Sequence, residues 1–133
     1  MSQAEEIPTS DPFADAIRNP ANPAHLMVVR PVGRRIRIYA GDTLLADSTR
    51  ALRVIEVGKS VYDPVVYVPG NDLAVAFERL EKSTHCPLKG NASYVALAGE
   101  ELGWTYENPI EAAAAIKGHF AFWQQKTRLV EGE

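Results

Sequence analysis

Arg35-Ile36-Arg37-Ile38-Tyr39 alternates charged and apolar side chains, and this period of two is the clearest structural signal in the chain. In an extended strand, the alternation puts both isoleucines on one face and both arginines on the other. Ala40-Gly41-Asp42 predicts a tight turn, and Thr43-Leu44-Leu45-Ala46-Asp47 predicts the return strand. The segment therefore indicates a β-hairpin with one buried face.

Apolar runs bounded by turn residues predict further strands. Residues 51–57 are rich in Leu, Val and Ile and end at Gly58, with a period that fits a strand slightly better than a helix. Pro64 and Pro69 bracket a β-branched run, which predicts a short buried strand. The remaining strand candidates are 92–97 and 104–106, forming a hairpin around a turn at 99–103, then 120–122 and 129–130.

Helical signals are few. Asn108-Pro109, followed by residues 110–117 with four alanines, predicts a helix that ends at Gly118. Residues 73–80 fit a short helix or a further strand equally well. Since no internal repeat or βαβ alternation is present, we expect a mainly β fold with one or two short helices.

The N-terminal region differs in composition from the rest. Residues 1–23 contain four prolines among small and polar residues, which predicts a mobile or docking N-terminal arm. Residues 13–18 fit one helical turn within it, docked on the domain or on a second subunit in a homodimer. We expect residues 24–133 to form a single domain, because the chain has only 133 residues.

Composition excludes several classes of protein. A hydrophobic fraction of 46% and a charged fraction of 23% are typical of a globular protein. The formal net charge of −3 gives no global basic field for nucleic acid or an anionic membrane. Apolar runs fall short of the roughly 20 residues that span a bilayer. We therefore expect a cytoplasmic protein with no nucleic-acid or membrane partner.

The segment Ser83–Tyr94 holds the densest chemistry, including Cys86, the only cysteine. Cys86 fits either a packing thiol or a nucleophilic or redox thiol, which would need a cation such as His85 or Lys89 to lower its pKa. In an extended strand His85 points away from Cys86, unless Pro87 bends the chain. Lys89, next to Gly90, fits either a solvated turn or a point charge that holds a carboxylate or phosphate.

Other polar residues suggest no metal or cofactor. The three histidines are scattered, and one cysteine cannot supply a thiolate set, so we expect neither a metal site nor another cofactor. Carboxylates beside turns fit a general base, a helix cap or a solvated group; they are Asp47, Asp63 and Asp72. Arginines from 34 to 53 fit either a positive face or cross-strand ion pairs.

Several motifs together resemble a known family. They are Arg35-Ile36-Arg37-Ile38, Gly41, Ala46-Asp47-Ser48, Tyr67-Val68-Pro69, Thr84-His85-Cys86-Pro87-Leu88-Lys89-Gly90-Asn91-Ala92-Ser93-Tyr94, Trp104-Thr105-Tyr106-Glu107-Asn108-Pro109 and Phe120-Ala121-Phe122. In this order, over roughly residues 25–130, the chain resembles the bacterial and fungal domain-of-unknown-function family 427 (DUF427). That family carries a nucleotidyltransferase-like label, but this chain lacks the Gly-Ser and paired-aspartate arrangement that metal-dependent nucleotidyl transfer uses.

The resemblance implies a fold similar to the β-tent, a pair of antiparallel sheets that meet at an angle. Methionine sulfoxide reductase B, yippee proteins and the ligand-binding domain of cereblon share it, usually with zinc on paired Cys-x-x-Cys motifs. A single cysteine departs from that pattern, so a zinc site does not carry over. What the resemblance does imply is a ligand pocket in the cleft between the sheets, which would gather Tyr67, Asp72, His85, Cys86, Lys89, Tyr94 and Trp104.

Three hypotheses follow for the function. The first is a protein that binds a small anionic or heterocyclic ligand in this cleft, with Tyr94 and Trp104 as walls, Lys89 as the charge and Asp72 or His85 as hydrogen-bonding groups. The second is a cysteine-dependent enzyme that uses Cys86 with His85 or Lys89. The third is a protein–protein interaction module without a ligand, built on the N-terminal arm and exposed strand edges.

Overall fold

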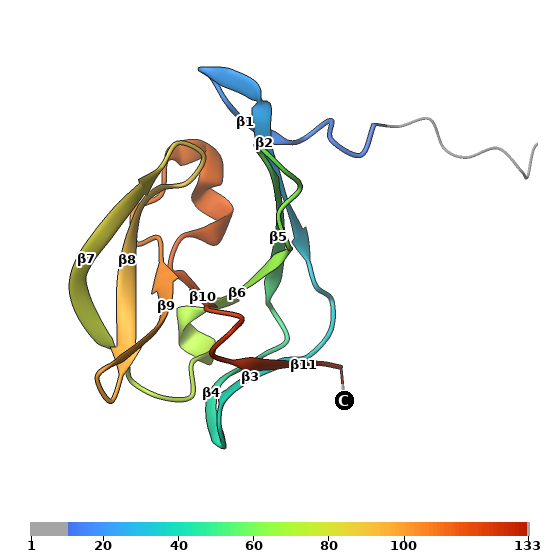
Figure 1. The fold of residues 1–133 in the computed structure, drawn as a ribbon. Helices are drawn as coiled ribbons and strands as arrows, with labels where there is room; N and C mark the ends of the chain where they lie inside the picture. Colours follow the sequence, from blue (N-terminus) through green and yellow to red (C-terminus); the bar gives the residue numbers. More distant parts are fainter. Residues whose placement is uncertain (1–10, 133) are drawn as a thin grey trace, which may run out of the picture.

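The computed structural model describes residues 11–132, and these form a mainly β fold (Figure 1). Within residues 11–132, two short 3-10 helices interrupt the strands. In chain order the elements are β1 (Ile17–Asn19), β2 (Asn22–Pro31), β3 (Ile36–Ala40), β4 (Thr43–Ser48), β5 (Leu52–Val57), β6 (Val65–Pro69), η2 (Gly70–Asp72), β7 (Glu78–Cys86), β8 (Gly90–Leu97), β9 (Glu100–Thr105), η3 (Glu111–Ile116), β10 (His119–Phe122) and β11 (Arg128–Glu131).

The strands form two antiparallel sheets. The large sheet has the order β1-β2-β5-β6-β10-β9-β8-β7, and the small sheet has the order β11-β3-β4. Figure 1 shows that the large sheet bends where β6 meets β10, so that β2 and β5 face β8 and β9 across the interior. We call β1, β2, β5 and β6 the first half of this sheet and the other four strands the second half. The predicted mainly β class with paired antiparallel sheets is confirmed.

The hairpin predicted from the alternating segment is β3 and β4 of the small sheet. Ile36 pairs with Ser48, and Arg37 pairs with Asp47 in the antiparallel register. Ile36 and Ile38 are 0% and 2% exposed, as the period of two requires. The turn between the strands uses Gly41 with a φ of +58°, a conformation that costs glycine little.

Ion pairing is the outcome for three of the arginines, although only the pair of Arg53 on β5 with Glu131 on β11 joins two strands. Arg35 donates to both carboxylate oxygens of Asp47, at 2.9 and 2.7 Å. Arg50 pairs with Asp72 and Arg53 with Glu131, both from other parts of the chain. These contacts support the ion-pair interpretation over a free positive face.

The hairpin of β8 and β9 is confirmed, but the predicted turn at residues 99–103 is wrong. The strands are joined at Ala98 and Gly99, which both have positive φ, at 52° and 82°. An alanine rarely adopts this conformation, so only Gly99 marked the turn in the sequence. The strand therefore starts at Glu100, four residues before the predicted start.

The helix predicted at residues 110–117 is also wrong in type and length. The segment forms the 3-10 helix η3, which covers Glu111–Ile116 and is broken by non-helical angles at Ala113. Ala113 and Ile116 are fully buried, so packing of these side chains sets the local path rather than alanine propensity. Gly118 ends the segment as predicted, with a φ of +70°.

Residues 11–23 belong to the structure more closely than the sequence suggested. Ala14 donates to the carbonyl of Asp11 in a turn, but Ile17 and Arg18 lie in strand β1 and not in the predicted helical turn. Ile17 packs against the core that contains Tyr67 and Tyr106, and this contact favours an extended chain at β1. The rest of the predicted arm, residues 1–10, lies outside the described residues.

Two apolar cores hold the sheets together. One lies between the large and small sheets and contains Ile36, Ile38, Leu45, Val68, Leu102 and Phe122. The other fills the bend of the large sheet and contains three buried tyrosines: Tyr67, Tyr94 and Tyr106. Buried tyrosine hydroxyls usually have hydrogen-bond partners, so this second core combines apolar packing with polar groups, as a binding site does. No helix in residues 11–132 is long and apolar enough to span a membrane.

Candidate functional site

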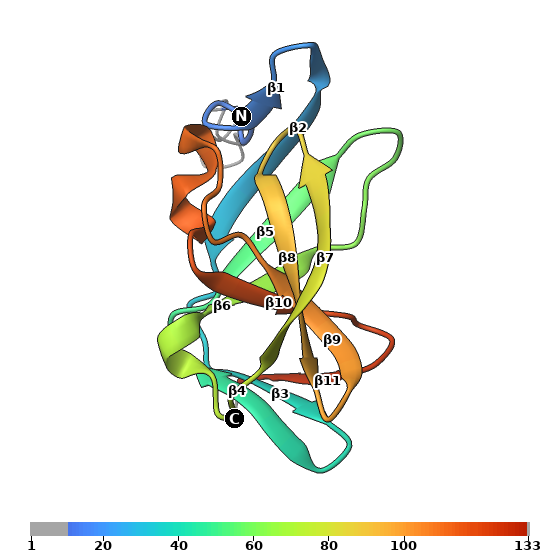
Figure 2. The same ribbon diagram turned by 90° about the vertical axis from the view of Figure 1, so that its left-hand side faces the viewer.

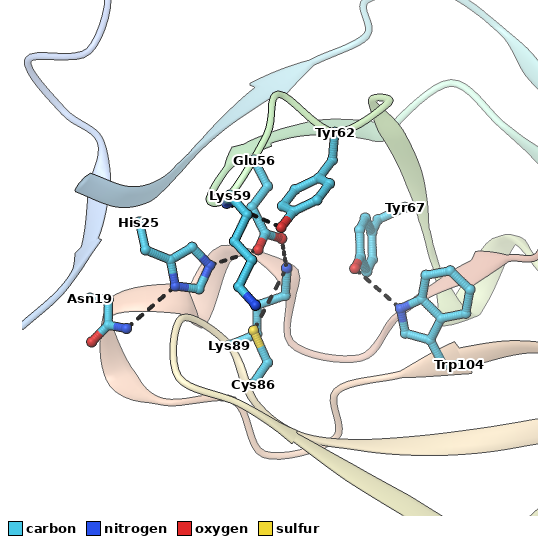
Figure 3. A network of polar contacts seen from close by, with 9 residues as sticks. All are labelled: Asn19, His25, Glu56, Lys59, Tyr62, Tyr67, Cys86, Lys89 and Trp104. Atoms are coloured by element: carbon cyan, nitrogen blue, oxygen red, sulfur yellow. Dashed lines mark hydrogen bonds and ion pairs between the residues drawn. The ribbon is translucent and has the colours of Figure 1, made fainter. Parts of the chain in front are cut away.

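A buried ion pair joins the two halves of the bent sheet. Glu56 Oε1 on β5 lies 2.6 Å from Lys89 Nζ in the turn between β7 and β8 (Figure 3). The Lys89 amide donates to the Cys86 carbonyl, and Gly90 follows with a φ of +109°. This turn directs Lys89 inward, where its side chain is only 7% exposed. The solvated-turn interpretation of Lys89 is therefore wrong.

A histidine and a cysteine extend the pair on either side. His25 Nε2 lies 2.8 Å from Glu56 Oε2, and the Asn19 amide nitrogen lies 3.3 Å from His25 Nδ1. If the Asn19 amide donates to His25 Nδ1, the proton of a neutral imidazole is on Nε2, and Nε2–H donates to the Glu56 carboxylate. On the other side, Cys86 Sγ lies 3.9 Å from Lys89 Nζ.

The ion pair keeps its charges despite burial. Burial disfavours the carboxylate of Glu56, but hydrogen bonds from Lys89 and His25 outweigh it, so the pKa of Glu56 lies below its ordinary value. Burial likewise disfavours the ammonium of Lys89, but its interaction with Tyr67 and its hydrogen bond to Glu56 outweigh that effect. The pKa of Lys89 is therefore raised. Both groups are charged at neutral pH.

Aromatic rings form the wall beside this pair. Trp104 Nε1 donates to the Tyr67 hydroxyl at 3.2 Å, as Figure 3 shows. The rings of Trp104 and Trp123 lie 4.6 Å apart between centroids, and Tyr94 stacks on Trp123 at 6.4 Å. Burial is the main reason why the pKa of Tyr67 is raised, so its hydroxyl stays neutral.

Tyr106 contributes a hydroxyl that has no partner among residues 11–132. The residue is 6% exposed, and its ring lies 6.5 Å from that of Tyr67. Burial raises the pKa of Tyr106, and Tyr67 and Cys86 raise it further, so the hydroxyl stays neutral. No hydrogen bond joins it to a described residue, and it is not one of the fully buried polar atoms, so it keeps some contact with solvent.

We call these residues the inner cluster: His25, Glu56, Tyr67, Cys86, Lys89, Tyr94, Trp104, Tyr106 and Trp123. Two surface recesses adjoin it. One of about 210 Å³ is lined by Trp104 and Trp123 together with Asp63. The other, of about 240 Å³, is lined by His25, Lys59 and Tyr62. The inner cluster is therefore approachable from two directions.

The structure brings together five of the seven residues expected at a ligand pocket. Tyr67, Cys86, Lys89, Tyr94 and Trp104 all belong to the second core or pack against it. Of these, Tyr94 lies at the border, where its hydroxyl is 2.8 Å from that of Thr84.

Asp72 and His85 have other surroundings. Asp72 accepts hydrogen bonds from Ser48 at 2.6 Å and from Arg50 at 3.0 Å. His85 Nδ1 lies 2.9 Å from Asn91 Oδ1 at an exposed position. His85 and Cys86 are neighbours on β7, so strand alternation turns them to opposite faces. Glu56 and His25 occupy the polar positions expected for Asp72 and His85.

Sequence reasoning missed four members of the inner cluster: His25, Glu56, Tyr106 and Trp123. Glu56 carried a signal, because it shares the strand period of Leu52 and Val54 and so faces the core from an apolar run. A single carboxylate at an inward position needs a buried partner, which Lys89 supplies. His25 carried no such signal, because it lies two residues after the predicted arm of residues 1–23, outside every predicted strand.

Among the described residues, no group of three or more His, Cys, Asp or Glu side chains is placed to hold a metal ion. The inner cluster has instead one ammonium, one carboxylate, one imidazole, one thiol and several aromatic rings. A family model with the description "Domain of unknown function (DUF427)" matches residues 28–132. No curated protein matches the chain.

Proposed function

The chain belongs to the DUF427 family, and we propose that it binds a small, partly planar ligand, either a heterocycle or an organic anion, at the inner cluster. The observation that carries the proposal is the hydroxyl of Tyr106, which has no partner within residues 11–132, on a ring that lies 6.5 Å from that of Tyr67 in the second core. A ligand atom that accepts a hydrogen bond from this hydroxyl would take the place of solvent there.

The aromatic wall supports a planar ligand. Trp104, Trp123 and Tyr94 form a continuous set of rings next to the recess at Trp104. Aromatic rings favour offset or edge-to-face contacts with other flat groups, which add about 0.5–1.5 kcal/mol beyond area burial. Binding sites for small molecules typically combine such apolar walls with a few directed polar groups.

The ion pair supports a ligand with acceptor atoms. An ammonium has three N–H donors, and the contacts of Lys89 are with Glu56 and Cys86. The third donor and the Tyr106 hydroxyl together suit a carbonyl or carboxylate oxygen. Because Glu56 already balances the charge of Lys89, a neutral heterocyclic carbonyl suits the site as well as an anion does.

A cysteine-dependent enzyme is the second candidate, favoured by one contact. Lys89 Nζ lies 3.9 Å from Cys86 Sγ, whereas His85 points to the other face of β7. Lys89 is therefore the assisting cation in this candidate. It predicts that iodoacetamide alkylates Cys86 at least tenfold faster in the wild type than in Lys89→Met, with equal rates in both proteins as the contradicting result.

The binding proposal has a convenient readout, since both tryptophans of the chain belong to the inner cluster. We expect one or more members of a panel of nicotinate, nicotinamide, orotate and uracil to quench tryptophan fluorescence in a saturable way. Tyr106→Phe removes only the unpartnered hydroxyl and should weaken that binding about five- to tenfold, since one hydrogen bond contributes about 1 kcal/mol.

The matched control is Tyr39→Phe. Tyr39 lies on β3 of the small sheet, next to Arg128 and away from the cluster. Its variant should bind as the wild type does. If no compound quenches the fluorescence, or if both variants bind equally well, the proposal is wrong and the interaction-module hypothesis gains support.

A further inference from the structure

A recess between the extended chain at residues 73–77 and strands β8 and β10 lies on the opposite face of β8 from the inner cluster. In the register of the second half, Tyr94 pairs with Trp104, whereas Ser93 pairs with Thr105, which in turn pairs with Phe120. Directly paired residues share one face, and neighbours along a strand alternate. Ser93, Thr105 and Phe120 therefore face away from the rings of the inner cluster.

One compartment of this recess is apolar. It has a volume of about 480 Å³ and is lined by Phe77, Phe120, Val95 and the extended chain at residues 73–76. The rings of Phe77 and Phe120 lie 6.5 Å apart, and their planes differ by 21°. In Figure 2, η2 and the chain that leads into β7 lie below β10. A flat ring system has both the space and the aromatic neighbours that it needs there.

An ion pair marks the boundary of this compartment. Arg79 Nη2 lies 2.8 Å from Glu107 Oε1, and both residues line the apolar recess. Ser93 connects them, because its hydroxyl accepts from Arg79 at 3.0 Å and donates to Glu107 at 3.1 Å. Arg79 and Glu107 are the only charged residues that line the recess within residues 11–132, and their charges cancel.

A polar compartment adjoins the same ion pair. It has a volume of about 250 Å³ and is lined by Arg79 and Glu107 together with the neutral side chains of Ser83, Asn91, Ser93 and Asn108. Both compartments share Arg79 and Glu107, so they adjoin across this ion pair, one apolar and the other lined by hydroxyl and amide groups. We call the two compartments together the trough. Neutral hydroxyl and amide groups pair well with the hydroxyls of a sugar.

We propose that this trough is a second binding site, which takes a neutral aryl glycoside. The flat aglycone lies between Phe77, Phe120 and Val95, and the sugar lies across the Arg79–Glu107 pair among the serine and asparagine side chains. A free anion on the ligand is disfavoured, because Glu107 neutralises Arg79 and repels a second negative charge. The site is independent of the function proposed for the inner cluster, since the two occupy opposite faces of β8.

The test uses the full chain and calorimetric titration with adenosine and 4-nitrophenyl β-D-glucopyranoside. Their charged counterparts are adenosine monophosphate and 4-nitrophenyl phosphate. We expect at least one neutral probe to bind, at least threefold tighter than its charged counterpart. Absence of binding by both neutral probes, or equal or tighter binding of the charged ones, would overturn the proposal.

Two variants locate the binding. Arg79→Met combined with Glu107→Gln changes two exposed side chains and should weaken binding at least tenfold. Ala76→Trp places a large ring at an exposed position on the apolar compartment and should also weaken it. The matched control is Ala112→Trp, at an exposed position on η3 away from the trough. Binding that survives both trough variants would contradict the assignment.

A separate readout distinguishes this site from the inner cluster. A probe bound in the trough should leave tryptophan fluorescence unchanged and should bind Tyr106→Phe as tightly as the wild type. If binding of the neutral probe quenches the tryptophans and is lost in Tyr106→Phe, the ligand occupies the inner cluster. That result would refute the second site while supporting the first.

Discussion

Removal of Lys89 should destabilise the protein more than any exposed ion-pair variant. In Lys89→Met, the carboxylate of Glu56, whose side chain is 22% exposed, loses the closer of its two partners. Its partial exposure places the loss toward the lower end of the range for buried pairs. Removing one partner of a buried ion pair costs about 3–5 kcal/mol, and His25 remains to offset part of this. We therefore expect a loss near the lower end, about 3 kcal/mol.

The corresponding change in melting temperature follows from chain length. Unfolding entropy is about 2.1 cal/mol/K per residue, so a chain of 133 residues has about 280 cal/mol/K. A loss of about 3 kcal/mol then lowers the melting temperature by about 10 °C. Urea unfolding followed by tryptophan fluorescence gives the free energy of unfolding, and calorimetry gives the temperature.

Two further variants make the experiment decisive. Glu56→Gln combined with Lys89→Met removes both charges and should recover most of the loss, because no buried charge remains unpaired. Arg35→Met breaks an exposed pair with Asp47 and should cost much less. If Lys89→Met is as stable as Arg35→Met, or if the double variant is the least stable of all, the ion pair does not hold the two halves together.

Three other outcomes follow from the structure. Folding lowers the pKa of Glu56, so its ionisation stabilises the fold above its ordinary pKa of 4.5, and this stabilisation is lost as pH falls through the folded value. The difference in unfolding free energy between wild type and Glu56→Gln should thus be constant from about pH 6 to 8 and shrink below about pH 4.5. A difference that grows on acidification would contradict this. Gly103→Ala should lower the free energy of unfolding in urea by several kcal/mol, because its Cβ would overlap the carbonyl oxygen of Ala121 where β9 meets β10. The control is Gly33→Ala, which has open space around it and should lower the free energy by only about 1 kcal/mol. Equal losses in the two variants would refute the close approach at Gly103. Ala98→Gly should raise the melting temperature, because it relieves an alanine at positive φ that costs about 1–2 kcal/mol, and a lower melting temperature would show that the turn is not strained.

The strands were predictable where the side-chain period was unambiguous. The alternation from Arg35 to Tyr39 needed only the geometry of a strand, and the structure buries both isoleucines. The segment at 110–117 was not predictable in the same way, because alanine propensity is a weak local preference. Burial of Ala113 and Ile116 against the core decides the path there.

The candidate site was predictable only in part, from Tyr67 on β6 and from motifs in the second half of the sheet. Lys89, Cys86 and Trp104 lie in motifs whose residues attract attention by type. Glu56 lies 33 residues away from Lys89 along the chain, and their contact exists only because the large sheet bends. Long-range pairing of this kind depends on sheet topology, which no local pattern encodes.

The central claim is that a ligand binds at the inner cluster, and the indole N–H signals of the two tryptophans test it most directly. Trp104 donates to Tyr67, and Trp123 donates to Glu101, so a ¹H–¹⁵N spectrum should show two distinct indole peaks, assigned with Trp123→Phe. On titration with the compound that quenches the fluorescence, we expect the Trp104 peak to move in a saturable way in the wild type. Binding heat in calorimetry with both indole peaks unmoved would contradict the account.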